Sequence, residues 1–137
     1  MLTLEKQIVY FTPLLKEFNM NIILATPFIE QMRGNRVTVE RIATSLRKQK
    51  INVHVISSTD EKVAIPWNKA DLYHGFNAYY FYQLQKRFKK KLSPYILTMT
   101  GTDLNHDLFS KERRKDVINA LKDAKGIHVF NDDAKQI

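Results

Sequence analysis

The chain contains no cysteine among its 137 residues. A disulfide-stapled scaffold, a cysteine-ligated zinc site and a cysteine nucleophile are therefore excluded. Glycine and proline are scarce as well, with four residues of each, and the chain shows neither an internal repeat nor a low-complexity segment. A chain without cysteine suits a reducing compartment, and we expect this protein in the cytoplasm.

Long apolar runs are also absent from the sequence. No stretch approaches the roughly 20 residues that an apolar helix needs to span a bilayer. The N-terminus does not resemble a signal peptide, because Glu5 and Lys6 come early and Thr12-Pro13 interrupts the apolar residues. We therefore expect any membrane contact to be peripheral, on the inner face.

The charge is one-sided, since 22 Lys and Arg residues against 14 Asp and Glu residues give a net +8. This positive excess is compatible with nucleic acid, an anionic membrane or a phosphorylated ligand as partner, and it does not distinguish among them. What is present indicates a folded domain. Hydrophobic residues make up 44% of the chain, which argues against disorder, and 137 residues fit one domain with a substantial core.

Short apolar runs alternate with amphipathic stretches from Met20 onward. The apolar runs predict strands over 21–26, 52–57, 70–74, 94–99 and 127–130. The amphipathic stretches predict helices over 36–49 and 77–90, and a third that Ser110 caps and whose inner face holds Val117, Ile118, Leu121 and Ala124. Segment 100–107 is expected to be a loop. This alternation predicts an α/β fold, a Rossmann-like parallel sheet with helices on both faces.

The two ends of the chain stand apart from this pattern. Apolar residues in segment 1–19 recur at helical spacing and predict an N-terminal helical extension before a domain over 20–137; they are Leu4, Ile8, Phe11, Leu15 and Phe18. Pro13 predicts a kink in that extension. The extension packs on the domain, binds a membrane or a partner, or precedes an ancestral start at Met20. At the other end the sequence stops as a helix begins, so we expect a module that is incomplete or completed by something else.

The first candidate site follows the first predicted strand, because ligands of open α/β sheets bind beyond the carboxyl ends of the strands. Gly34-Asn35-Arg36 leads into a helix there, and backbone N–H groups at a helix start attract phosphate. The alternative interpretation is an ordinary loop glycine followed by an N-cap. The loop lacks both Gly-x-Gly-x-x-Gly and Gly-Lys-Ser/Thr, so neither an NAD site nor a P-loop is predicted.

The densest polar cluster comes directly after the fourth predicted strand. Its hydroxyls and amide suit a sugar or another polyol, and a carboxylate there can accept a proton. The polar residues of the cluster, together with its glycine, are Thr100, Gly101, Thr102, Asp103, Asn105, His106 and Asp107. His74 and Asn77 end the third predicted strand at the same edge. The alternatives are turn chemistry for the cluster and a structural role for His74. No two histidines have metal-ligand spacing on one helix, so no metal site is predicted.

A basic run closes the second predicted helix, with five cations within 86–91: Lys86, Arg87, Lys89, Lys90 and Lys91. A second group follows at 113–115. Cations at a helix end usually interact with water and with the helix dipole, while the other interpretation is a patch that faces anionic lipid. No helix-turn-helix or aromatic RNA-binding motif is present, and we do not expect nucleic acid as the partner.

Five segments in order resemble a known family: 20–24, 34–38, 70–74, 98–103 and 124–131. The series is similar to the N-terminal Rossmann-like domain of group 1 (family 4) glycosyltransferases, whose GT-B fold sets two such domains across a cleft. The Gly-Asn-Arg-x-Thr and Thr-Gly-Thr-Asp-Leu forms resemble a subgroup of sugar transferases. The resemblance covers residues 20–137.

The resemblance implies retaining transfer of a sugar from a nucleotide-diphosphate sugar to a sugar or lipid-linked acceptor, without a metal or cofactor. It places Gly34, Asn35 and Arg36 near the donor phosphates. It also places the 100–103 segment in the cleft, with Asp103 as the catalytic candidate. Many members carry His-Gly where this chain has Thr100-Gly101, so a histidine contact to the donor sugar does not carry over.

The same resemblance assigns donor binding to a C-terminal domain that this sequence lacks. We therefore expect the donor-binding half as a further domain or a separate subunit, and little or no turnover by this chain alone. The rival expectation is a non-catalytic interaction module that docks on a membrane or on a second polypeptide.

Overall fold

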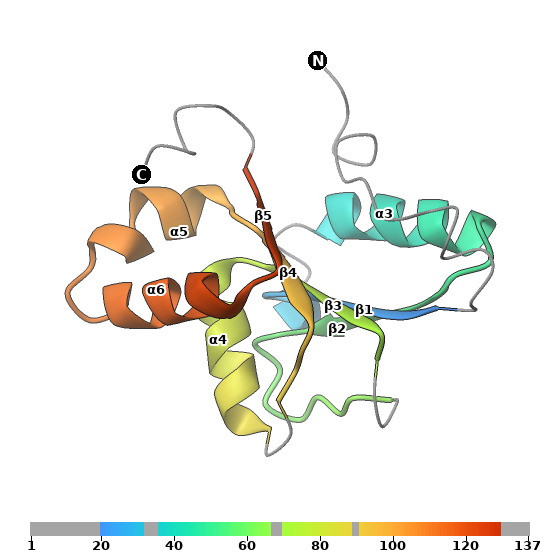
Figure 1. Cartoon of the computed structure of the whole chain (residues 1–137), viewed down its shortest axis with the longest axis horizontal. Helices are drawn as coiled ribbons and strands as arrows, with labels where there is room; N and C mark the ends of the chain where they lie inside the picture. Colours follow the sequence, from blue (N-terminus) through green and yellow to red (C-terminus); the bar gives the residue numbers. More distant parts are fainter. Residues whose placement is uncertain (1–19, 32–35, 67–69, 89–90, 130–137) are drawn as a thin grey trace.

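A five-stranded parallel sheet forms the centre of the protein (Figure 1). The structure is a computed structural model that describes residues 20–31, 36–66, 70–88 and 91–129. The strands are β1 (Asn21–Thr26), β2 (Asn52–Ser57), β3 (Leu72–Phe76), β4 (Tyr95–Thr98) and β5 (Gly126–His128). Their order across the sheet is β2-β1-β3-β4-β5, and each neighbouring pair is parallel. The predicted α/β class and Rossmann-like parallel sheet are confirmed.

Four α-helices and two short 3₁₀ helices lie within the described residues. They are η1 (Ile29–Gln31), α3 (Arg36–Lys48), α4 (Ala78–Arg87), α5 (Gly101–Asn105), η2 (Asp107–Phe109) and α6 (Arg114–Asp123). The helices predicted over 36–49 and 77–90 are confirmed, with ends displaced by one to three residues.

One face of the sheet is covered by α3. Its buried side chains recur at helical spacing and pack on β1 and β2 and on the end of β3; the α3 set is Val39, Ile42, Ala43 and Leu46. Their main partners are Ile22, Leu24 and Phe76. This apolar stripe is what holds α3 on the sheet, because helices in proteins gain most of their stability from packing.

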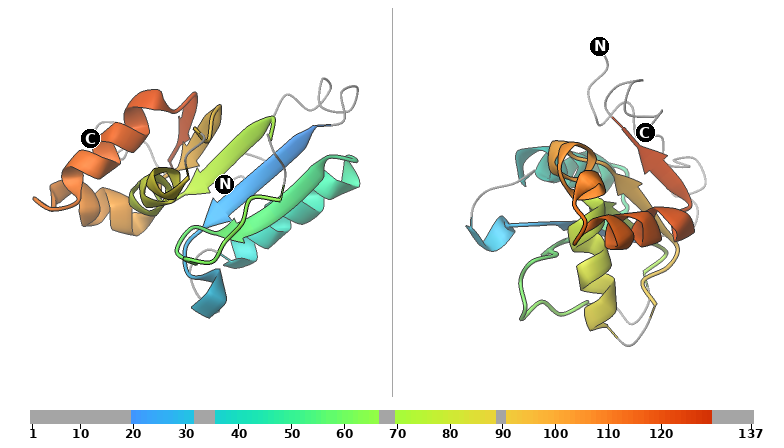
Figure 2. Two further views of the ribbon diagram at one scale, coloured as in Figure 1. Left: turned by 90° about the horizontal axis from the view of Figure 1, so that it is seen from below. Right: turned by 90° about the vertical axis from the view of Figure 1, so that its left-hand side faces the viewer.

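The opposite face is covered by α4 and α6 (Figure 2). Buried Phe81 and Leu84 of α4 join Val117 of α6 in one core with strand residues that include Tyr95 and Leu97. Helices therefore lie on both faces, as the alternation of elements predicts.

The sheet reverses its direction of growth at β1. The chain leaves β1 through α3 to reach β2 on one side, and it later returns to add β3, β4 and β5 on the other side. The boundary between β1 and β3 is therefore the topological switch point, and the carboxyl ends beside it are where α/β sheets of this kind bind ligands.

Several local predictions differ from the structure. Segment 100–107 is not a loop, because it holds α5 and the start of η2. The third strand runs over 72–76 rather than 70–74 and the last over 126–128 rather than 127–130. Ser110 lies before a turn that precedes α6. Of the predicted inner face, Val117 is buried and Leu121 and Ala124 pack half-buried against the core, while Ala120 is buried in addition. The predicted extension over 1–19 lies outside the described residues.

Candidate functional site

Two residues with left-handed backbone flank the switch point. Phe28 comes two residues after β1 with φ 67°, and Asn77 comes directly after β3 with φ 76°. Such φ values are costly for residues other than glycine, above all for a bulky aromatic, and they cluster at functional sites. We therefore built the candidate site around the carboxyl ends of β1 and β3.

Hydroxyl groups hold the Phe28 turn against the end of β2. The Phe28 N–H donates to Thr59 Oγ1 at 2.9 Å, and both Ser57 Oγ and Thr59 Oγ1 donate to the carboxylate of Glu30. This arrangement aims the Phe28 ring at α4, where it meets the Tyr80 ring edge-to-face with centroids 5.0 Å apart. The pair places apolar ring surface at the switch point.

Asp103 fastens the starts of two helices to each other. Its Oδ2 accepts the N–H of Ala78, the first residue of α4, at 2.9 Å, and its Oδ1 accepts the N–H of Thr100 at 2.7 Å. We call these two contacts the Asp103 clamp. Asn77 adds to it, because its Oδ1 accepts the Tyr80 N–H and its Nδ2 donates to Thr100 Oγ1 at 3.2 Å. The sequence predictions Asn77, Thr100 and Asp103 are thus brought together.

The Asp103 side chain is fully buried. Burial raises the pKa of Asp103 to about 6, although the backbone N–H groups of Ala78 and Thr100 oppose the rise. Both carboxylate oxygens accept hydrogen bonds from the backbone, so the geometry gives Asp103 a positioning role at the N-termini of α4 and α5. Its predicted catalytic role stays a prediction.

His74 lies in the interior of the sheet rather than at its edge. The imidazole is fully buried, its Nε2 lies 2.7 Å from Thr98 Oγ1, and it stacks on Phe76 with centroids 4.3 Å apart. Burial and the charge of His128 lower the pKa of His74 to about 3, so the ring is neutral at physiological pH. A group this deep does not reach a ligand in solvent.

The remaining predicted site residues divide into two sets. Gly101, Thr102 and Asn105 are exposed on α5, which the Asp103 clamp holds at the carboxyl edge. Arg36 begins α3, and its guanidinium forms an ion pair with Glu40 at 3.0 Å. Gly34 and Asn35 lie outside the described residues, so the predicted phosphate contact stays a prediction.

Another group of interacting polar side chains begins at the end of α5. The Nδ1 of His106 lies 3.0 Å from Oδ1 of the fully buried Asp107, and Arg113 Nη1 donates to the same oxygen at 3.2 Å. The Arg113 guanidinium in turn lies over the Tyr79 ring, 4.4 Å from its centroid. A carboxylate only accepts hydrogen bonds, so Nδ1 carries a hydrogen, and in the neutral form of the ring Nε2 is an acceptor; the ring is 70% exposed.

The sequence showed His106 and Asp107 within the polar cluster but gave no reason to select them. Their significance comes from Arg113, which donates to the Asp107 carboxylate and lies over the ring of Tyr79, a residue distant in sequence. An imidazole oriented by a buried carboxylate is the arrangement of a general base.

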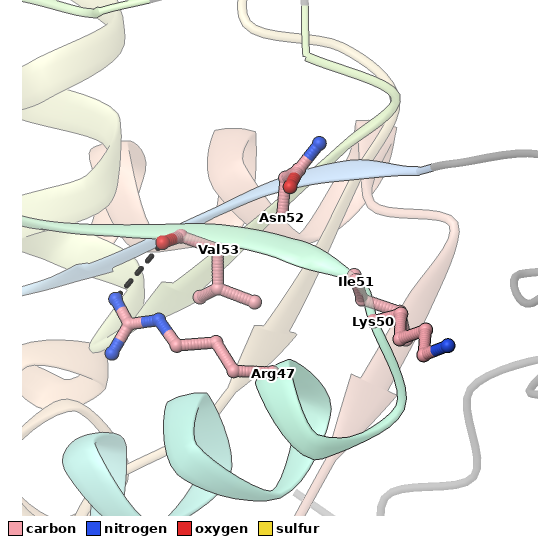
Figure 3. Close-up of a pocket in the computed structure, with 5 residues that line it drawn as sticks. All are labelled: Arg47, Lys50, Ile51, Asn52 and Val53. Carbon is pink, nitrogen blue, oxygen red and sulfur yellow. Dashed lines mark hydrogen bonds between the residues drawn. The ribbon is translucent and has the colours of Figure 1, made fainter.

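An open hollow of about 660 Å³ lies at the opposite end of the sheet (Figure 3). It is lined by Arg47, Lys50, Ile51, Asn52 and Val53, around the amino end of β2. Arg47 Nη2 donates to the carbonyl oxygen of Val53 at 2.9 Å, and so it covers an outward-facing acceptor of an edge strand. Protection of the sheet edge accounts for Arg47, and this hollow lies away from the carboxyl edge.

Two cations of the basic run are already engaged. Lys86 forms an ion pair with Asp116 of α6 at 3.2 Å, and Arg87 donates to the carbonyl oxygen of Ser58 at 2.7 Å. Lys91 is exposed, while Lys89 and Lys90 lie outside the described residues. Lys86 and Arg87 therefore fasten α4 to its neighbours.

Nothing in the described residues indicates a metal or a membrane span. Among them, no three His, Cys, Asp or Glu side chains gather as a metal site would require. No helix in the described ranges is long and apolar enough to cross a bilayer.

Comparisons with protein-family models, with curated proteins and with solved structures find no match to this chain. The glycosyltransferase resemblance therefore rests on the sequence motifs alone.

Proposed function

We propose that this chain is the acceptor-side domain of a retaining glycosyltransferase, which moves a sugar from a nucleotide-diphosphate sugar to an acceptor hydroxyl. The observation that carries the proposal is the β1/β3 switch point of a parallel α/β sheet, flanked by the left-handed residues Phe28 and Asn77. The motif series of the sequence supplies the sugar chemistry.

The groups at this edge suit a sugar. Phe28 and Tyr80 offer apolar ring surface against which the C–H face of a pyranose can pack. Thr102 and Asn105, exposed on α5, offer a hydroxyl and an amide to sugar hydroxyls. His106 Nε2 is an acceptor for the proton of the attacking hydroxyl.

The proposal assigns the donor to another domain or subunit. Stabilising a departing diphosphate requires cations around it, and a closed cleft must exclude water. In the proposal Gly34, Asn35 and Arg36 approach the donor phosphates from this side, and the partner half supplies the rest. This chain alone is then expected to turn over little or nothing.

The test begins with the native species from its source cell, purified with any bound partner and identified by intact mass. The assay measures sugar transfer and nucleoside diphosphate release with a panel of nucleotide sugars. We expect transfer by the native assembly and none above background by the purified 137-residue chain. Transfer by the purified chain would refute the acceptor-side assignment, and no transfer by either would refute the proposed function.

A variant pair locates the site within that assay. Tyr80→Ala removes a ring at the switch point and should lower transfer by roughly tenfold or more, a loss expected for one well-packed aromatic contact. Tyr82→Ala is the matched control, because Tyr82 lies on the same helix beside Lys86 and Asn119. Equal losses in both variants would contradict the placement of the site.

A further inference from the structure

Phe109, at the end of η2, has the most exposed large apolar side chain among the described residues. Its side chain is 71% exposed, compared with 64% for Val37 on α3 and 50% for Ile127 on β5. Single exposed apolar side chains are common on protein surfaces, so Phe109 becomes a candidate contact only together with the charges beside it in the sequence.

Exposed cations follow this ring in the sequence. Residues 109–115, which we call the η2–α6 tip, carry exposed Lys111, Arg114 and Lys115 against one exposed acid, Glu112. The tip is therefore a positive surface with an aromatic residue at its start. A positive patch with an exposed aromatic is complementary to a surface that is anionic outside and apolar beneath.

The tip is held in shape from within. The Arg113 N–H donates to Ser110 Oγ, and the Arg114 N–H donates to the Ser110 carbonyl oxygen at 2.9 Å. The Arg113 side chain turns inward to Asp107 and the Tyr79 ring. The other three cations are left at the surface, so the tip does not need to be ordered on binding.

The tip also projects. In Figure 1 the turn that joins η2 to α6 forms the left-hand extremity of the ribbon, and in the right-hand panel of Figure 2 this end faces the viewer. A convex projection meets a flat surface more readily than a concave site does. Nucleic acid, in contrast, is usually held in a groove or along an extended basic stripe.

We propose that the η2–α6 tip docks this protein on the surface of an anionic lipid bilayer. Phe109 enters the boundary between headgroups and acyl chains, and Lys111, Arg114 and Lys115 contact the anionic headgroups. The tip is distinct from the run over 86–91, in which Lys86 and Arg87 are engaged within the protein.

The proposal stands independently of the proposed function, since lipid binding requires no sugar. The two are compatible in space. His106 lies three residues before Phe109, so docking by the tip brings the exposed imidazole toward the headgroup layer. The hydroxyl of a lipid-linked acceptor would lie in that layer.

The experiment is co-sedimentation of the full chain with vesicles of phosphatidylcholine alone and of phosphatidylcholine mixed with phosphatidylglycerol. We expect binding to the mixed vesicles only, and loss of that binding as salt is added. Phe109→Ser, and separately the triple variant Lys111→Gln, Arg114→Gln, Lys115→Gln, should each reduce the partition coefficient by roughly tenfold or more.

Matched controls on α3 and at Lys50, two residues after its end, separate this site from general effects of charge and hydrophobicity. Val37→Ser removes a comparably exposed apolar side chain, and Arg41→Gln with Lys48→Gln and Lys50→Gln removes three exposed cations. Both controls should bind vesicles like the unaltered chain. Equal losses in controls and tip variants, or equal binding to both vesicle types, would overturn the proposal.

Fluorescence supplies a readout that is specific to the tip. Phe109→Trp in a Trp67→Phe background makes the tip residue the sole tryptophan of the chain. Its emission should shift to the blue when mixed vesicles are added and stay unchanged with phosphatidylcholine. An unchanged spectrum with bound vesicles would refute docking by Phe109. Binding of a DNA or RNA oligonucleotide without binding of vesicles would make nucleic acid the partner instead.

Discussion

At the scale of single residues, Asp103 joins parts of the chain that are distant in sequence. One carboxylate accepts the N–H of Ala78 and the N–H of Thr100, and so serves the start of α4 and the start of α5. If the segment after β4 is interpreted as a turn, its sequence accounts for the Thr100 contact, which spans three residues. The Ala78 contact spans 25 residues, and only the fold creates it.

Replacing Asp103 by alanine should cost about 2–4 kcal/mol of unfolding free energy, because two buried backbone N–H groups lose their acceptor. Asp123→Ala, at an exposed position on the last turn of α6, should change it by less than about 0.5 kcal/mol. Urea denaturation followed by circular dichroism measures both. A fully stable Asp103→Ala chain would contradict the positioning role.

His74 makes stability depend on pH. Burial, with the charge of His128, lowers its pKa from 6.5 to about 3, so the unfolded chain binds the proton at a higher pH than the folded chain does. The stability from neutral His74 is fully present above pH 6.5 and is lost as the pH falls toward 3. The loss amounts to at most about 1.4 kcal/mol per pH unit.

Asp103 acts in the opposite direction. Burial raises its pKa from 3.8 to about 6, so its contribution is fully present below pH 3.8 and is lost as the pH rises through about 6. His74→Gln should therefore remove the loss of stability on acidification, and Asp103→Asn should steepen it. Urea midpoints of both variants between pH 3.8 and 6.5 test this. Parallel profiles of urea midpoint against pH for the unaltered chain and the two variants would contradict this expectation.

At the scale of elements, Gly75 sets the approach of α4 to β3. A Cβ atom at Gly75 would lie 2.5 Å from the Phe81 ring and 3.0 Å from Leu97, both in the buried core. The sequence shows a glycine in a strand, but it does not show that the reason is a ring from the following helix. The close approach keeps the start of α4, with Tyr80, beside the switch point.

Gly75→Ala should destabilise the protein by about 1–3 kcal/mol, because the core must shift to admit the methyl group. Gly101→Ala is the matched control, since a Cβ there meets only Asn105 Nδ2 at 3.7 Å and the position begins a helix. The control should be neutral or slightly stabilising. Thermal unfolding of both variants checks the pair, and equal melting temperatures would contradict the packing argument.

Periodicity was sufficient for the longer elements and insufficient for the short ones. The strands over 21–26 and 52–57 were predictable as short apolar runs, and the helix that begins at Arg36 was predictable because its buried residues recur at helical spacing. Segment 101–105 is too short to show a period, and its helix depends on the capping contacts of Asp103. Local patterns cannot reveal such a contact.

At the scale of the whole molecule, the sequence located the edge of the sheet but not the arrangement of side chains along it. The alternation of strands and helices predicts that the carboxyl ends hold the site, and the polar residues after β3 and β4 do meet there. Burial then separates them, since His74 and Asp103 face inward while Thr102 and Asn105 face solvent. The imidazole of His106 becomes a candidate only through Asp107 and Arg113.

The most direct test of the central claim is a nuclear magnetic resonance titration of the isotope-labelled 137-residue chain with methyl glycosides and nucleotide-diphosphate sugars. We expect at least one sugar to shift the amide signals of Phe28, Tyr80, Thr102 and His106, at the carboxyl edge. No shift with any sugar, or shifts confined to the hollow around Arg47 and Val53, would contradict it.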